Sequence, residues 1–341
     1  MNDRATIYKV AEEANVSVRT VSRYLNDPDC VSRKTSALIV EAMQRLQFRP
    51  SKAARSLKGV KPNLIGVISD RITTSPDSFE LIKGLQLATR DFGKRLLIAE
   101  CGGATEDVPG LIDEMIEHDV EALIFATHFH HQVDSSAIEA AGDLRVVLLN
   151  CFSTNKNLPA VVPDDERGAQ KGLAHLYALG HRRVVVFELF PDMRATKLRR
   201  AGCLKAARAA GLPDPVFVQG SQPGGEDEFT AIDALVGEVL RAHRPTAIFA
   251  GNDKMAARII QSLHKRQISV PRQVSVLGFD DHPMLVHATD PLLTSVRLPY
   301  LQMGRRAAHM ACTGEGAGVV REPCEVVDRA SVGAPPRGGH P

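Results

Sequence analysis

The first 61 residues of the chain differ from the rest in both charge and hydrophobic pattern. They hold twelve Lys and Arg against six Asp and Glu, a net charge of +6, whereas the remaining 280 residues hold 30 against 34, a net charge of −4. Short helical patterns in the first part give way to alternating strand and helix patterns in the second. We therefore predict a small basic helical head on a larger, mildly acidic body, an asymmetry that indicates a polyanionic partner.

Three short helices are predicted in the head, because apolar residues recur there three and four positions apart. Each pattern follows a hydroxyl residue that suits an N-cap, namely Thr6, Ser17 and Ser32. Residues 15–17 form a turn between the first two helices, and the third helix completes a core. Two helices joined by about three turn residues, with a third packed on them, form the helix-turn-helix pattern.

The second predicted helix carries Arg19 and Arg23 on the side opposite its apolar residues Val18, Val21 and Leu25. In helix-turn-helix modules the start of this helix meets base edges in the major groove, where Arg pairs with guanine O6 and N7. The alternative is that both arginines are solvated surface charges. The turn, the caps and the net charge of +6 together favour the DNA-binding interpretation.

Residues 1–50, and the segment 6–26 above all, resemble the head of the bacterial LacI/GalR transcription regulators; residues 31–35 and 48–50 continue the likeness. The resemblance implies that Val18 reads a base, although helical spacing alone places it on the core side. The base readers that the resemblance implies are Val18, Arg19, Ser22 and Arg23. The resemblance also implies phosphate contacts from Ser17, Thr20, Asn26, Ser32 and Thr35, and Thr6 is a further predicted DNA contact.

Residues 51–61 are predicted to be a hinge segment. An N-cap serine and a closing glycine bound residues 52–58, which can form two helical turns. Seven residues are too few to hold a helix alone in water, so without a partner a basic linker of no fixed structure is expected. The resemblance implies that two hinge helices pair in the minor groove of DNA, with Ala53 on their apolar face and Leu57 wedged between base pairs.

The body alternates short β-rich runs with amphipathic helical patterns, which predicts parallel sheets flanked by helices. Eight or more strands in this length fit two doubly wound lobes better than one sheet. The strand candidates are 64–69, 95–100, 121–126, 145–150, 184–187, 216–219, 246–250 and 274–279.

Three crossings between the lobes are expected, which makes a hinged cleft with a ligand at the carboxyl ends of the strands. Residues 331–341 are expected to be a disordered tail. The predicted crossings lie near 161–165, 290–294 and 322–326, so that within the body, residues 62–330, lobe 1 comprises about 62–161 and 293–322, and lobe 2 about 164–290 and 324–330.

The family resemblance extends through residues 179–183, 251–256 and 276–281 and covers the chain from about Thr6 to about Arg329. It implies that the α/β body has the two-lobed periplasmic-binding-protein-like fold, built from doubly wound parallel sheets.

Polar residues at the ends of predicted strands are the candidate ligand contacts. Thr127, Asn150, Asn252 and Asp280 each close or follow a strand, and Arg199 stands where the family carries its effector-binding arginine. A carboxylate accepts from vicinal hydroxyls, whereas an Arg fork and amides donate to others, so this set predicts a sugar-like effector. For Asp280 the alternative is a capping or turn carboxylate before the next helix.

Aromatic residues are few, and the chain has no Trp, so a stacking face for a sugar would come from Phe or Tyr, with Phe152, Phe190 and Phe279 as candidates. His128 and His130 lie on one side of an extended segment. No Cys or carboxylate set of metal-ligand spacing accompanies them, which favours a cleft-rim loop over a metal pair.

Other patterns argue against catalysis and export. The six cysteines form no C-x-x-C and indicate reduced, mostly buried thiols in a cytoplasmic protein. The sequence has no phosphate-binding glycine loop and no nucleophile elbow, and it has neither a membrane-length apolar run nor a signal peptide. We expect no catalytic residues, no metal and no cofactor.

The function that these features predict is a transcription repressor whose affinity for double-stranded operator DNA is controlled by a small sugar-like effector between the lobes. The tail lacks a leucine-heptad helix, which favours a homodimer. A sugar-binding transport component would fit the body but not the head. An enzyme would need a nucleophile–base pair that the cleft candidates do not supply. Whether the effector is an inducer or a co-repressor stays open.

Overall fold

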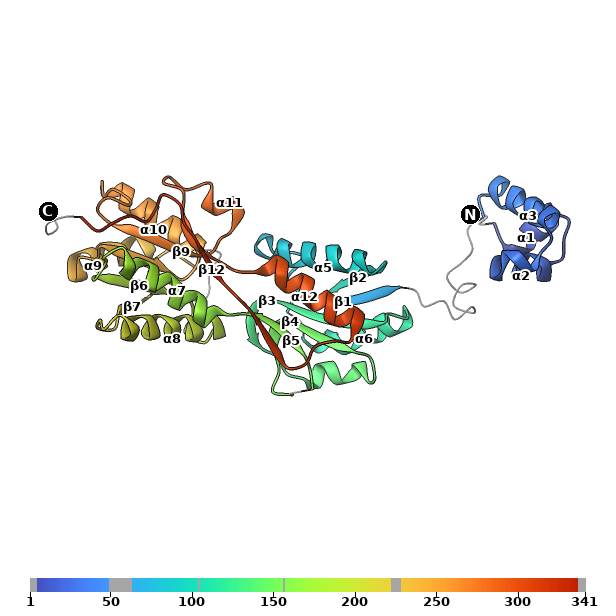
Figure 1. Ribbon diagram of the computed structural model, residues 1–341, viewed down its shortest axis with the longest axis horizontal. Helices are drawn as coiled ribbons and strands as arrows, with labels where there is room; N and C mark the ends of the chain where they lie inside the picture. Colours follow the sequence, from blue (N-terminus) through green and yellow to red (C-terminus); the bar gives the residue numbers. More distant parts are fainter. Residues whose placement is uncertain (1–4, 49–62, 104, 156, 222–227, 337–341) are drawn as a thin grey trace. The chain divides into compact units, whose positions relative to one another are not determined.

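Two compact units make up the computed structural model (Figure 1): the head within residues 1–62 and the body within residues 63–341. The hinge segment 51–61, with the predicted DNA contacts Ala53 and Leu57, lies outside the described residues. The residues that the structure describes are 5–48, 63–103, 105–155, 157–221 and 228–336.

Three α-helices form the head, as predicted: α1 (Ile7–Glu13), α2 (Val18–Asn26) and α3 (Arg33–Arg45), with a short 3₁₀ helix η1 (Pro28–Cys30) before α3. Their starts are set by side-chain caps. The hydroxyls of Thr6, Ser17 and Ser32 each accept a hydrogen bond from the backbone N–H three residues on, at 3.4, 3.0 and 3.2 Å.

The turn between α1 and α2 contains Asn15 at φ +51°, a left-handed conformation that Asn tolerates well. One small core holds the three helices together, and it includes Val10, Val21 and Ile39, all fully buried. The spacing of apolar residues in the sequence therefore predicted the face that each head helix buries.

Two six-stranded sheets form the body, and every described pairing in them is parallel except the antiparallel pair β10–β12. The first sheet has the order β11-β5-β4-β3-β1-β2 and the second β12-β10-β9-β8-β6-β7. The strands of the first are β1 (Leu64–Asp70), β2 (Arg95–Glu100), β3 (Ala122–Gln132), β4 (Val146–Phe152), β5 (Ala160–Pro163) and β11 (Val319–Glu322). Those of the second are β6 (Val184–Glu188), β7 (Val216–Gln219), β8 (Ala247–Ala250), β9 (Ser275–Asp280), β10 (Thr294–Arg297) and β12 (Glu325–Val327).

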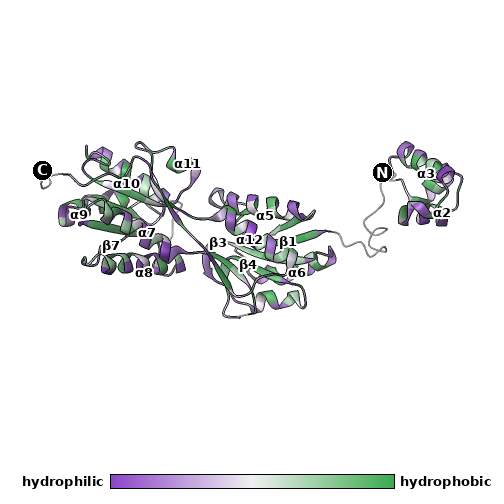
Figure 2. Ribbon diagram, in the orientation of Figure 1, coloured by the Kyte–Doolittle hydropathy of each residue, from purple (hydrophilic) through white to green (hydrophobic). Residues whose placement is uncertain are grey.

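Helices cover both sheets. Figure 1 shows α5 beside α12 on the first sheet and α7 beside α8 on the second, and these two helix pairs are in contact. The strands are mostly hydrophobic and the outer helix faces mostly hydrophilic (Figure 2). The helices are α5 (Phe79–Asp91), α6 (Val108–Glu117) and α12 (Tyr300–Thr313) in lobe 1, and α7 (Asp165–Ala178), α8 (Arg194–Ala209), α9 (Ile232–His243), α10 (Asp253–Lys265) and α11 (Pro283–Val286) in lobe 2; short 3₁₀ turns are η2 (Pro76–Ser78), η3 (Thr105–Asp107) and η4 (Ser136–Ala141).

The predicted fold class, a helical head with a two-lobed body of doubly wound parallel sheets, is confirmed. The crossing expected near 290–294 differs from the structure. β10 (Thr294–Arg297) pairs with β9 and lies in the second sheet, so the chain returns to lobe 1 between Arg297 and Tyr300. Thr294 and Ser295 are fully buried there, but a strand of four residues with two hydroxyls shows no clear strand pattern.

The expectation of a disordered tail from residue 331 is wrong for its first part. Ser331 is fully buried, and its hydroxyl donates to the carbonyl of Val276 and accepts from the N–H of Thr294, at 2.6 and 2.8 Å. The carbonyl of Gly333 accepts from the buried imidazole of His181 at 2.8 Å. Residues 331–333 therefore pack over β9, a tertiary contact that amino-acid composition cannot reveal. Residues 337–341 lie outside the described residues.

Candidate DNA-binding and effector-binding sites

Exposed basic residues line the second helix of the head. Arg19 and Arg23 are exposed on α2, while Ser22 and Val18 are half-buried. Val18 packs against the head core, as helical spacing predicted, so its reading of a base stays a prediction. Arg23 Nη2 lies 3.5 Å from the carbonyl oxygen of Cys30, so the guanidinium reaches η1.

Hydroxyl pairs mark the starts of α2 and α3. Ser17 and Thr20 lie 2.8 Å apart, and Ser32 and Thr35 lie 2.9 Å apart. Helix N-termini with such hydroxyls and free N–H groups suit phosphate oxygens. The predicted contact Asn26 is the last residue of α2. The structure thus places the predicted hydroxyl residues at helix starts and Arg19 and Arg23 on the exposed surface of α2, whereas Val18 packs against the head core.

In lobe 1 two predicted effector residues hold an irregular segment of β3. The register of β3 against β4 shifts between Ala126 and His131. Thr127 Oγ1 lies 2.8 Å from the carbonyl oxygen of Phe129 and 3.1 Å from that of Asn150. The amide of Asn150 donates to the carbonyls of Thr127 and His128, at 3.0 and 2.9 Å. Both side chains are buried, so their first role is to shape the bulge.

The three histidines that follow Thr127 have three different partners. His128 Nδ1 lies 2.8 Å from Ser78 Oγ, His130 Nδ1 2.8 Å from Asp165 Oδ2, and His131 Nδ1 2.8 Å from the carbonyl oxygen of Phe129. Within the described ranges no group of three or more His, Cys, Asp or Glu could hold a metal ion. The segment is a strand bulge at the cleft.

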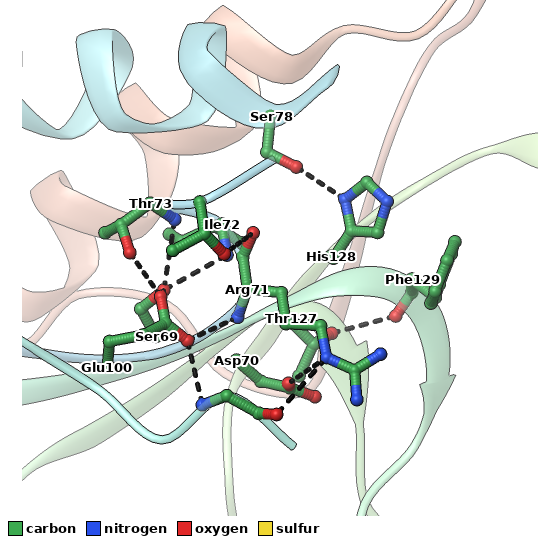
Figure 3. Close-up of polar contacts among 12 residues, drawn as sticks. Ser69, Asp70, Arg71, Ile72, Thr73, Ser78, Glu100, Thr127, His128 and Phe129 are labelled. Atoms are coloured by element: carbon green, nitrogen blue, oxygen red, sulfur yellow. Dashed lines mark hydrogen bonds and ion pairs between the residues drawn. The ribbon is translucent and has the colours of Figure 1, made fainter. Parts of the chain in front are cut away.

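Beside this bulge, the end of β1 is tied down by one carboxylate (Figure 3). Glu100 accepts from the hydroxyl of Ser69 at 2.5 Å, from the backbone N–H of Arg71 at 2.6 Å and of Gly102 at 3.0 Å, and from the hydroxyl of Thr73. Burial raises the pKa of Glu100, but these four donors outweigh it and hold the pKa below its ordinary value.

In lobe 2 Arg199 is the centre of a charged cluster. Its Nε donates to Asp165 and its Nη1 to the carbonyl of Gly251, at 2.8 and 2.5 Å, and its Nη2 lies 3.8 Å from Asp280. The guanidinium carbon lies 3.6 Å from the centre of the Phe279 ring. Two candidate ligand contacts, Arg199 and Asp280, therefore lie side by side, whereas Phe279, fully buried under the arginine, offers no open face for a sugar.

Close packing of α7 on α8 positions this cluster. A Cβ on Gly202 would lie 2.0 Å from the carbonyl oxygen of Glu166, so the two helix backbones touch at this point. Asp165 precedes Glu166 on α7, and Arg199 lies about one turn before Gly202 on α8. Burial raises the pKa of Asp165, yet Arg199 and then His130 outweigh it and hold the pKa below its ordinary value.

Asn252 is the N-cap of α10, since its Oδ1 accepts from the N–H of Met255 at 2.9 Å. Asp280, at φ +117°, ends β9 and is partly exposed. It borders an open cavity of about 330 Å³ between the lobes. Phe79, 42% exposed at the start of α5, and Tyr300 at the start of α12 line the same cavity from lobe 1.

The sequence argument missed Asp165, Phe79 and Tyr300. Asp165 carried a signal, a carboxylate at a helix start beside a predicted crossing. The two aromatic residues begin helices of lobe 1, far in sequence from the strand ends on which the prediction rested.

Of the six cysteines, four are buried, and burial raises the pKa of the Cys151 thiol to about 12.

Family models match both parts of the chain. Residues 6–51 match the bacterial regulatory proteins of the lacI family, and residues 173–332 match the periplasmic binding protein-like domain. The HTH-type transcriptional regulator DegA of Bacillus subtilis is 30% identical over 88% of this chain and 88% of its own length. The sucrose operon repressor of Escherichia coli is 28% identical over 96% of this chain and 99% of its own length.

The comparison of folds agrees. The crystal structure of the Lac repressor dimer bound to operator and the anti-inducer ONPF has a TM-score of 0.80 at 23% identity, over 97% of this chain and 100% of that one. The capped head and the two-lobed body define a DNA-binding transcription regulator. The chain belongs to the lacI family of bacterial regulatory proteins. In the part of the chain that the structure describes, no helix is long and apolar enough to cross a membrane.

Proposed function

We propose that the protein is a homodimeric transcription repressor that acts in the cytoplasm and whose operator affinity is set by a small sugar-like effector. One observation carries the proposal. A capped helix-turn-helix head with exposed Arg19 and Arg23 shares its chain with a two-lobed body in which Asp280, beside Arg199, borders an inter-lobe cavity. The likeness to the sucrose operon repressor supports the sugar class.

For the head, the proposed roles follow from exposure and helix position. Arg19 and Arg23 read bases in the major groove together with Ser22 and Val18. The hydroxyl residues at helix starts position the head on phosphates, and the hinge segment enters the minor groove. The residues proposed for phosphate or minor-groove contact are Thr6, Ser17, Thr20, Asn26, Ser32, Thr35, Ala53 and Leu57.

For the body, Asp280 is proposed to accept hydrogen bonds from vicinal hydroxyls, while Arg199 donates to a neighbouring oxygen. Thr127 within β3, Asn150 within β4 and Asn252 at the N-cap of α10 complete the proposed site. All of these are binding roles, and no catalytic step, metal or cofactor is proposed.

The regulatory step is a shift between two lobe arrangements. A ligand that contacts lobe 1 and lobe 2 together favours one arrangement, and it changes operator affinity by its differential affinity and no more. Two heads of a dimer then read half-sites about one helical turn apart.

Selection of duplexes from a random DNA pool tests the DNA-binding part. We expect a near-palindromic site of roughly 14–20 base pairs. Arg23→Ala should lower affinity by about 1–3 kcal/mol and relax preference at one symmetric pair of positions. Lys34→Ala, an exposed control on α3, should weaken all sequences about equally. A sequence preference that Arg23→Ala leaves unchanged would contradict the assignment.

Thermal unfolding with sucrose, ribose, cellobiose, their phosphates and free nucleobases tests the effector class, because a bound ligand raises the melting temperature by mass action. We expect a sugar to raise it in the wild type. A shift with nucleobases alone would refute the sugar class. The effect of the hit on operator affinity then distinguishes an inducer from a co-repressor.

A further inference from the structure

One carboxylate connects the effector-binding arginine to the opposite lobe. Asp165, the first residue of α7, follows directly on the crossing from β5 into lobe 2. One of its oxygens accepts from Arg199 Nε at 2.8 Å, and the other lies 2.8 Å from Nδ1 of His130 on β3 of lobe 1. The side chain of Asp165 is 0% exposed and that of His130 is 6% exposed.

Neighbouring groups make this contact part of a packed cluster. The ring of Phe152, on β4 of lobe 1, stands edge-on to His130 with ring centres 5.8 Å apart. The guanidinium of Arg194, on α8 of lobe 2, lies 5.5 Å from the centre of the same Phe152 ring. Two elements of lobe 1 thus meet two elements of lobe 2 around His130, and water has little access to the hydrogen bond.

We propose that His130 and Asp165 are positioning residues that tie the orientation of Arg199 to the hinge between the lobes. The inference rests on the proposed function and deepens it by assigning the residues through which the site senses the lobe arrangement.

The physical reason is the shared carboxylate. Asp165 has two oxygens, and each is engaged by a different lobe. A rotation of lobe 1 about the crossings moves His130, and with it the carboxylate that holds the Arg199 Nε–H. An effector that draws Arg199 toward itself pulls on the other oxygen of the same carboxylate. The buried chain of hydrogen bonds from His130 through Asp165 to Arg199 therefore couples ligand binding to the lobe arrangement.

A double-mutant cycle tests the linkage without any ligand or DNA. Urea unfolding of the full chain is measured for wild type, His130→Ala, Asp165→Ala and the double variant. His130→Ala should raise the unfolding equilibrium constant in both backgrounds. We expect the factor of increase to be at least five times larger in the wild type than in Asp165→Ala. Should Asp165→Ala not fold, Asp165→Asn replaces it, because a neutral amide removes the charge from the bond. Equal effects in both backgrounds would overturn the proposal.

The positioning role has its own readout, which a purely local packing role would not move. Hydrogen exchange is followed in peptides that cover residues 194–203. His130→Ala should speed exchange around Arg199, although His130 lies on the other lobe. His131→Ala is the matched control, because His131 lies on the same strand but its Nδ1 bonds only within that strand, to Phe129. His130→Asn, which keeps a donor close to the position of Nδ1, should restore more than half of the protection.

Operator affinity completes the test, with a duplex that the wild type selects from a random pool. His130→Ala should change the dissociation constant at least threefold although the head is untouched, and His131→Ala should not. Unchanged affinity, or unchanged exchange at residues 194–203, would refute the coupling role. A pool that yields no duplex would refute the proposed function instead, and the cycle and the exchange would still decide the linkage.

Discussion

The two lobes of the body share one strand order but differ in how their cleft-facing polar groups are satisfied. In lobe 1 Glu100 and the Thr127–Asn150 pair bond to nearby backbone and hydroxyl groups of the same lobe. In lobe 2 Arg199 joins two carboxylates, and one of them also bonds to lobe 1. The comparison indicates that lobe 1 has a pre-shaped wall, whereas lobe 2 carries the charged groups that we propose respond to a ligand.

Loss of Asp165 should have the largest effect. Asp165→Ala leaves the buried guanidinium of Arg199 without its main counter-charge, which costs about 3–5 kcal/mol of unfolding free energy. Equilibrium urea unfolding measures the change. Glu166→Ala is the neighbouring control, since Glu166 pairs with Lys205 at the surface and such pairs contribute about 1 kcal/mol or less. Equal losses of unfolding free energy in both variants would contradict the claim that Asp165 is the main counter-charge of Arg199.

Loss of Asp280 should affect ligand affinity more than stability. Its side chain is 28% exposed and lies 3.8 Å from Arg199, so the fold depends on it little. Hydrogen bonds to a charged group contribute about 1.5–3 kcal/mol each, so Asp280→Ala should raise the dissociation constant of the sugar found in the screen at least about tenfold. Calorimetry measures it, with Glu238→Ala on the exposed face of α9 as control. Wild-type affinity in both Asp280→Ala and Arg199→Ala would place the ligand elsewhere.

Asp253 in lobe 2 and Glu100 in lobe 1 should contribute to the pH dependence of stability with opposite signs. In lobe 2, burial raises the pKa of Asp253 to about 7, although Ser295 and the N–H of His282 donate to it. A carboxyl pKa raised on folding stabilises the protein below the unfolded pKa, and this contribution is lost as pH rises through about 7. Asp253→Asn should therefore flatten the fall in melting temperature between about pH 4 and about pH 7, as followed by thermal unfolding across that range.

Glu100 in lobe 1 should show the opposite and smaller effect. Because four donors hold the pKa of Glu100 below its ordinary value, its contribution is present above the unfolded pKa and is lost as pH falls through the folded pKa. Glu100→Gln should reduce stability at neutral pH by about 1 kcal/mol, since the site is partly exposed, and should weaken the acid-side loss. The same pH slope in Glu100→Gln as in the wild type would contradict this role.

Local sequence signals predicted the head well because its structure is local. Caps, a turn with Asn15 and apolar spacing act over three to seven residues, and each was legible without knowledge of the rest of the chain. The boundary of the lobes was less accessible. β10 is four residues long and is defined by its partners β9 and β12, which the local pattern does not contain.

Among the candidate effector residues, the sequence placed Asp280 at the end of β9 and Asn252 just after β8, but Asn150 lies inside β4, which continues to Phe152. It could not show that the side chain of Asn252 caps α10, or that both amide hydrogens of Asn150 are used by the bulge in β3. Hydrogen-bond partners from another strand or from the next helix decide how much of a side chain is left for a ligand.

The sequence by itself determined the basic helical head and the α/β body, because charge, periodicity and motif spacing are properties of neighbouring residues. Only the tertiary structure decided that His130 meets Asp165 across the lobes, that Phe79 and Tyr300 line the cavity, and that Ser331 covers β9. These contacts join segments 35 to more than 200 residues apart, and parallel sheets bring such segments together through crossovers that no local pattern records.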